Sequence, residues 1–299
     1  MLMPHSDKFS LFSVRLRSII GGNYMGNSTI LKEEQVWDNE QHAYLKEKGT
    51  YCHPNDLCII LGGLNYDLYD SPIGTSAWWL TTSGSSGAGA VRCVFRKVLA
   101  FGLFSNSRSS VVRPALLPSS KITSSPRTGV RGKGWHEITY GEYPTNVVNN
   151  STSKTLERDL KGLIKTGKKY TFDTHKWNEY NETYSPKSYD EYEQNGKRYV
   201  RIECYAFTKD ENTKLSDGLS RKNGDVVWLE VEPIKLAVDE KTGIALSING
   251  LYSGIQMIDK GGNYNGDFSK TRQKKYLEEV FDKEIEPSRK QERRSSITI

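Results

Sequence analysis

The adjacent tryptophans Trp78 and Trp79 constrain the fold of this chain more than any other feature. Each indole can bury roughly 150–250 Å², so exposing both to water would be costly. Neighbouring side chains of a β-strand point to opposite faces of the sheet, so one indole is expected in a core. The other indole should then meet a second layer, a partner or a ligand.

Composition favours a folded protein with β-structure and long polar loops. The 299 residues include 17 Tyr and 6 Trp, and only 36% are hydrophobic. Chains rich in Tyr, Gly, Ser and Asn often use strands and contact-making loops. The formal net charge is +6, without a dense basic stripe interleaved with aromatic residues. Solvated surface charge is the favoured interpretation, and no specific nucleic-acid partner is expected.

The sequence also predicts a soluble chain. No run approaches the roughly 20 apolar residues that span a bilayer, so no membrane span is expected. Arg15 and Arg17 interrupt the only apolar stretch near the N-terminus, which argues against a secretory signal. The compartment stays open, including association with a cell surface or a particle.

In the first half, residues 30–48 have the loose apolar stripe of a helix, with Thr29 as N-cap and Gly49 as its stop. Strands are predicted for 58–61, 77–81, 90–104 and 111–117. Pro114 lies within the last of these, and proline places a segment at a sheet edge or a strand end.

In the second half, apolar residues at helical spacing predict a helix over 153–166, ended by Gly167. Further strands and a last helix follow; the predicted strands cover 198–206, 226–232, 234–238 and 244–247, with a turn at Thr242-Gly243, and the helix covers 270–284. The whole chain divides into a module over 1–122, a linker rich in Ser, Pro and Gly over 123–137, a module over 138–286, and a basic tail over 287–299.

Two sets of motifs resemble one bacterial family, domain of unknown function 6273. Trp78-Trp79-Leu80 and Val112-Arg113-Pro114-Ala115-Leu116 resemble its closing half. Three other segments resemble the opening half of the family: Tyr140-Gly141-Glu142-Tyr143-Pro144, Glu232-Pro233-Ile234-Lys235-Leu236 and Ala245-Leu246-Ser247. The chain departs from the family pattern at three places. Thr81-Thr82-Ser83 stands where the family has an Arg-Ser-Pro run, Thr145 stands where it has a glutamine, and Leu236 stands where it has a tryptophan.

The resemblance implies an α+β, C-type lectin-like fold, in which a twisted antiparallel sheet and flanking helices support long ligand-facing loops. The closing half precedes the opening half here, so the chain is either a slice of a tandem array or a circular permutant. In a permutant, residues 139–285 would supply strands that pair with 77–117 in one sheet. Each half alone would leave an exposed sheet edge, which proteins usually cover.

The candidate ligand contacts are Trp78, Trp79, Arg113, Tyr66 and Tyr69. An outward indole could stack on a sugar, and Arg113 could bind an anion. Both features also have a structural interpretation. The tryptophans would then belong to a core, and Arg113 would form an internal pair or cover an aromatic ring.

Other polar groups suggest chemistry only weakly. Cys52 and Cys58 could form a disulfide or half of a metal site, without a second pair at ligand spacing. Asn65, Asp67 and Asp70 could ligate calcium, although turn formation is the commoner role. The acidic run 190–193 could supply paired carboxylates but reads as a solvated turn. No catalytic residue and no cofactor is predicted.

The sequence therefore predicts a non-catalytic recognition module that binds a glycan or a protein surface through loops rich in Tyr, Asn and Ser. One alternative is a structural component of a phage or cell-surface assembly. The other is an enzyme with a cleft between the two halves.

Overall fold

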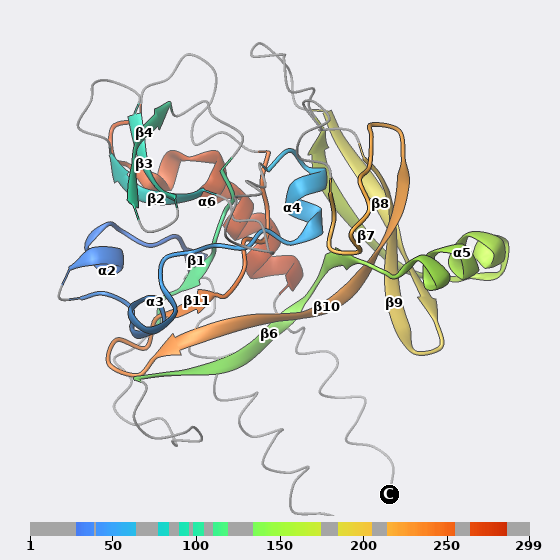
Figure 1. The fold of residues 1–299 in the computed structure, drawn as a ribbon, viewed down its shortest axis with the longest axis horizontal. Coiled ribbons are helices and arrows are strands. Elements are labelled where there is room, and N and C mark those ends of the chain that lie inside the picture. The colour runs from blue at the N-terminus through green and yellow to red at the C-terminus, as the bar shows by residue number, and fades with distance from the viewer. Residues whose placement is uncertain are drawn as a thin grey trace, which may run out of the picture.

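The computed structural model describes residues 28–38, 40–63, 77–83, 90–95, 98–104, 110–118, 134–174, 185–204, 214–254 and 264–285. These residues form an α+β fold with two antiparallel sheets and short flanking helices (Figure 1). The α+β prediction is confirmed at this level. The predicted calcium loop 65–70 and basic tail 287–299 lie outside the described residues.

The long strand β10 (Val226–Asp239) is the centre of the larger sheet, whose order is β1-β5-β11-β10-β9-β8-β7. β9 (Lys197–Glu203) pairs with the start of β10, and β11 (Ala245–Ser247) pairs with its end. β6 (Trp135–Val147) pairs with β10 from Leu229 to Asp239, so it must occupy the other edge. The sheet therefore extends from β10 as two wings on one side, with β6 alone on the other.

Strands from both halves of the chain join in this sheet. β5 (Ala115–Leu116) lies between β1 (Ser28–Thr29) and β11. Just before β5, the Pro114 carbonyl accepts a hydrogen bond from the Ser247 amide at 2.8 Å. The single sheet expected from 77–117 and 139–285 is therefore present only at β5 and β11, because residues 78–104 form a sheet of their own, and Pro114 precedes β5, consistent with a strand end.

The tryptophan pair belongs to a second sheet of three strands. β2 (Trp78–Ser83) pairs with β3 (Ala90–Phe95), and β3 pairs with β4 (Val98–Phe104). The predicted single strand over 90–104 is therefore two strands. A parallel bridge from Trp78 to Val111 connects this sheet to the segment that leads into β5.

The two indoles enter different cores, as strand geometry predicts. Trp79 packs in the main cluster, which spans both wings of the larger sheet and the last helix. Trp78 packs in a smaller cluster with residues of the N-terminal helices. A third cluster lies under α5 (Asn150–Asp159), around Trp228.

The predicted helix over 30–48 is wrong in extent. It is two short helices, α2 (Glu34–Trp37) and α3 (Ala43–Lys48), and Thr29 lies in β1 instead of capping a helix. Gly49 does end α3, and its φ of 84° is the left-handed conformation that favours glycine. The break between α2 and α3 creates a corner on the surface.

The predicted strand over 58–61 is also wrong, because this segment belongs to helix α4 (Asp56–Ile60). The side chain of Asn55 caps α4 by accepting a hydrogen bond from the Cys58 amide at 2.8 Å. All five residues of α4 are buried, so the helix has no polar face that would have produced a periodic pattern.

The helix predicted for 153–166 is shorter than expected. α5 is followed by a 3₁₀ turn, η1 (Leu160–Gly162), and then by strand β7 (Ile164–Thr174), which contains Gly167. β7 pairs with β8 (Ser185–Gln194) at the end of the sheet.

The last predicted helix is confirmed in position but differs in type. It consists of a 3₁₀ turn η3 (Phe268–Lys270), the α-helix α6 (Arg272–Tyr276) and a π-helix η4 (Leu277–Ile285). This segment packs into the main cluster through Tyr276, Leu277 and Phe281, and η4 contacts β1 and β6. Within the described residues, none of the helices combines the length and apolarity needed to cross a bilayer.

Candidate functional site: an acidic concavity around Trp37

The predicted ligand contacts lie inside the protein. Trp78, Trp79 and Arg113 each have 0% of their surface exposed. Their structural interpretations therefore hold, and a role as surface contacts for a ligand does not fit this structure. Tyr66 and Tyr69 lie outside the described residues.

Arg113 donates to the backbone of two other segments. Its Nε donates to the Ser247 carbonyl at 2.8 Å, and its Nη2 donates to the Ile248 carbonyl at 3.1 Å. Its Nη1 donates to the Tyr51 carbonyl at 3.4 Å. The guanidinium also lies over the Trp78 ring. These contacts bind the segment before β5 to the loops around it, so Arg113 organises the fold.

The cysteines show no sign of redox or metal chemistry in the described part of the chain. Cys52, Cys58 and Cys204 are buried free thiols. Burial raises the pKa of the Cys52 and Cys58 thiols and raises that of Cys204 to about 12. Cys52 and Cys58 thus do not form the disulfide that was one possibility for this pair. Among the described residues, no group of three or more His, Cys, Asp or Glu side chains has an arrangement that could hold a metal ion.

The acidic run 190–193 lies on strand β8, so its prediction as a solvated turn is wrong. Glu191 is buried and accepts hydrogen bonds from the Tyr170 hydroxyl at 2.7 Å and the Thr166 hydroxyl at 2.8 Å. Arg198 lies 3.9 Å from the same carboxylate. A buried carboxylate with this many partners stabilises the sheet.

A second buried carboxylate, Asp56, holds an irregular loop to the body of the protein. It accepts hydrogen bonds from the Ser216 amide at 2.8 Å and the Ser216 hydroxyl at 2.5 Å. It also accepts one from the Val147 amide at 2.8 Å, at the end of β6. Burial raises the pKa of Asp56 in spite of these donors.

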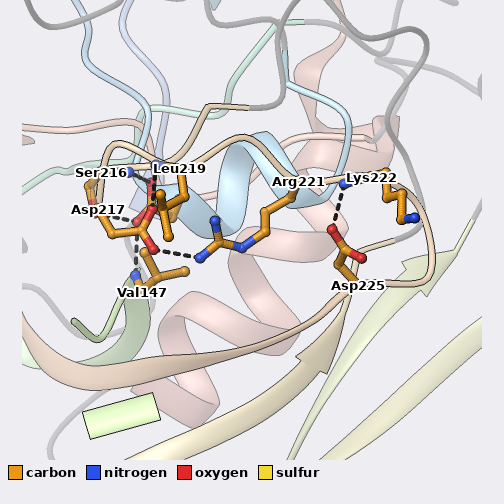
Figure 2. A network of polar contacts seen from close by, with 8 residues as sticks. Val147, Ser216, Asp217, Leu219, Arg221, Lys222 and Asp225 are labelled. Carbon is orange, nitrogen blue, oxygen red and sulfur yellow. Dashed lines mark hydrogen bonds and ion pairs between the residues drawn. The ribbon is translucent and has the colours of Figure 1, made fainter. Parts of the chain in front are cut away.

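The loop that Asp56 holds has internal polar contacts of its own (Figure 2). Asp217 and Arg221 form an ion pair, and Asp217 accepts from the Leu219 amide at 3.0 Å. Asp225 accepts from the Lys222 amide at 2.9 Å. Because these polar groups find their partners within the loop, the loop has a defined conformation.

An open, shallow concavity lies at the corner between α2 and α3. It has a volume of about 750 Å³ and is lined by Glu34, Trp37, Asp38 and Glu40. Trp37 is only half-buried and packs against the cluster that contains Trp78. The concavity therefore combines an aromatic side chain with three carboxylates.

Backbone hydrogen bonds fix this corner. The Gln41 amide donates to the Asp38 carbonyl at 2.8 Å, and the His42 amide donates to the Gln35 carbonyl at 3.0 Å. The Glu33 amide donates to the Thr82 hydroxyl at 3.0 Å, which ties the start of α2 to β2. These contacts hold the backbone on both sides of the corner, from which the lining side chains extend.

A smaller groove of about 280 Å³ lies where η1 meets the turn between β8 and β9. Its lining includes Ile164, which is 67% exposed, but it contains no aromatic side chain. The concavity at the α2–α3 corner is larger and chemically richer, and it is the better candidate for a binding site.

Comparisons with protein families, with curated proteins and with solved structures find no match. The resemblance to domain of unknown function 6273 therefore remains a prediction. The concavity is not apparent when residues 30–48 are interpreted as one helix. Asp38 and Asn39 are poor helix formers in the middle of that span, and this signal could have located the corner.

Proposed function

We propose that this chain is a non-catalytic recognition module that binds a cationic group of its ligand at the α2–α3 corner. One observation carries the proposal: Glu34, Asp38 and Glu40 line the same concavity as the half-buried side chain of Trp37. The site replaces the predicted contacts at Trp78, Trp79 and Arg113, which are enclosed in the core.

The residue types in this site match the chemistry of an organic cation. Three carboxylates create a local negative potential that attracts positive charge. An indole face adds about 0.5–2 kcal/mol when an ammonium or guanidinium group lies over it. Lys32 lies 3.7 Å from Glu34, but both side chains are well exposed, and such pairs contribute little. A ligand cation can therefore displace Lys32 at small cost.

Two ligand sources supply this chemistry. An amino sugar within a glycan presents a primary ammonium group among hydroxyls. A lysine side chain on a protein surface presents the same group without them. The open, shallow shape of the corner admits either, and the experiment below separates them.

Isothermal titration calorimetry with four probes tests the proposal. The glycan arm compares a glucosamine tetramer with its fully N-acetylated form, and the protein arm compares a lysine tetrapeptide with its acetyl-lysine form. Acetylation removes the charge and keeps the backbone, so only the charged member of a pair should bind. The pair with the tighter charged member identifies the source.

Variants assign the binding to the corner. Trp37→Ala should abolish binding, whereas Trp37→Phe should keep most of it because an aromatic face remains. Glu34→Gln should weaken binding, and Glu203→Gln provides the matched control. Glu203 is a similarly exposed carboxylate that pairs with Lys187 on the distant β8–β9 wing. Absence of binding by both charged probes, or equal binding by Trp37→Ala, overturns the proposal.

A further inference from the structure

His42 is a buried histidine whose two ring nitrogens are both engaged. Only 2% of its surface is exposed. Nδ1 accepts a hydrogen bond from the Tyr44 amide at 3.2 Å, which caps the start of α3. Nε2 lies 3.0 Å from the Ile244 carbonyl, which can only accept. These partners require a neutral ring with its proton on Nε2.

This histidine joins the α2–α3 corner to the turn after β10. Asp239, the last residue of β10, strengthens the same junction by accepting from the Ala43 amide at 2.8 Å and from the Thr242 amide at 2.7 Å. On the other side, the His42 amide donates to the carbonyl of Gln35 in α2. The junction therefore fixes both ends of the concavity's backbone.

A second proton on His42 is incompatible with this junction. It would place an N–H group on Nδ1 directly against the Tyr44 N–H, and α3 would lose its cap. Two charged groups face the ring: Asp239 from β10 favours the cation, and Arg113 from the segment before β5 opposes it. Burial, the largest effect, lowers the pKa of His42 below its ordinary value.

We propose that His42 is a proton-operated clasp that holds the α2–α3 corner closed at neutral pH and releases it in mild acid. The ring takes the second proton only when the junction opens. Because the open form binds the proton more readily, the closed form has its full stability above about pH 6.5 and loses it as the pH falls. The regulatory consequence, that ligand affinity falls in mild acid, rests on the proposed function; the opening itself does not.

Hydrogen exchange of the full chain tests the opening without any ligand. Exchange at the Ala43 and Tyr44 amides, corrected for intrinsic rates, is measured from pH 7.5 to pH 5.0. Opening should increase below pH 6.5, by at most about thirtyfold at pH 5.0, since one proton changes an equilibrium at most tenfold per pH unit. Protection that stays constant across this range overturns the clasp.

Two variants assign the effect to His42. His42→Asn keeps an oxygen that can cap α3 but cannot titrate, so the pH dependence should disappear. His136→Asn is the matched control, because His136 is a partly exposed histidine that pairs with Glu240 at 3.8 Å on the same side of the fold. It should retain the wild-type pH dependence. Loss of the dependence in His136→Asn, or its persistence in His42→Asn, contradicts the assignment.

The regulatory consequence is measured with the lysine tetrapeptide, whose side-chain ammonium groups stay charged from pH 7.5 to pH 5.0. Its affinity should fall with pH in the wild type and stay level in His42→Asn. If the peptide fails to bind at pH 7.5 and the glucosamine tetramer fails to bind at a pH that protonates its amino groups, while exchange still shows the opening, the proposed function fails and the clasp stands. If binding is present at pH 7.5 and exchange is flat, the clasp fails and the proposed function stands.

Discussion

The guanidinium carbon of Arg113 lies 5.0 Å from the centroid of the Trp78 ring. Trp78 begins β2 of the three-stranded sheet, whereas Arg113 precedes β5 of the larger sheet. The contact therefore joins the two sheets at their boundary. It also explains why two short motifs far apart in the sequence belong to one structural unit.

Replacing Arg113 should destabilise the fold. Arg113→Met keeps much of the volume but leaves the carbonyls of Ser247, Ile248 and Tyr51 without this donor. The expected loss is about 2–4 kcal/mol of unfolding free energy, measured by urea denaturation. Arg113→Lys should lose less, because it keeps the charge but lacks the planar fork. Wild-type stability in Arg113→Met contradicts a structural role.

The two adjacent tryptophans should respond differently to replacement by phenylalanine. The Trp78 indole donates to the Thr50 carbonyl at 3.0 Å, whereas the Trp79 indole nitrogen is buried without a hydrogen-bond partner. Both variants lose packing volume, but only Trp78→Phe also breaks a hydrogen bond and strands a carbonyl. Trp78→Phe should therefore be less stable than Trp79→Phe by about 1–2 kcal/mol in the same denaturation assay. The reverse order is incompatible with these contacts.

Removal of the Asp56 carboxylate should release the loop that contains Ser216. Asp56→Ala leaves the Ser216 and Val147 amides without their acceptor and should cost about 2–4 kcal/mol. Ser216→Ala removes only the hydroxyl contact and should cost about 1 kcal/mol. Hydrogen exchange at the Ser216 amide should rise sharply in Asp56→Ala and little in Ser216→Ala. Equal effects in the two variants would show that the carboxylate does not anchor the loop.

The thiols of Cys52, Cys58 and Cys204 should be inert in the native protein. All three are buried, and burial raises their pKa values, so little thiolate is present at neutral pH. Alkylation by iodoacetamide, located by peptide mass spectrometry, should be absent in buffer and complete in denaturant. Rapid native alkylation of Cys52 or Cys58 would instead indicate an accessible, activated thiol.

Much of the sheet could be predicted from local patterns. The strands predicted over 226–232 and 234–238 and the turn at Thr242-Gly243 correspond to β10 and its antiparallel return to β11. The closing of β5 against β11 was predicted from the exposed edge that each half would otherwise leave. These features depend on short apolar segments, turn residues and unpaired sheet edges, which can be recognised in the sequence.

The remaining features depend on contacts that sequence does not record. α4 is buried all round, so its short apolar run looked like a strand. Glu191 is buried only because β7 brings Tyr170 and Thr166 against it. The concavity around Trp37 requires a break between two short helices and packing against a separate cluster. In each case the deciding partners are distant in sequence.

The most direct test of the account follows the indole N–H of Trp37 in a ¹⁵N–¹H spectrum during titration with the glucosamine tetramer, the lysine tetrapeptide and their acetylated forms. Binding at the α2–α3 corner predicts that at least one charged probe shifts this resonance in a saturable way. Neither acetylated form should shift it, and the indole resonances of the enclosed Trp78 and Trp79 should not move. A Trp37 resonance that does not move at saturating concentrations of either charged probe contradicts binding at the α2–α3 corner.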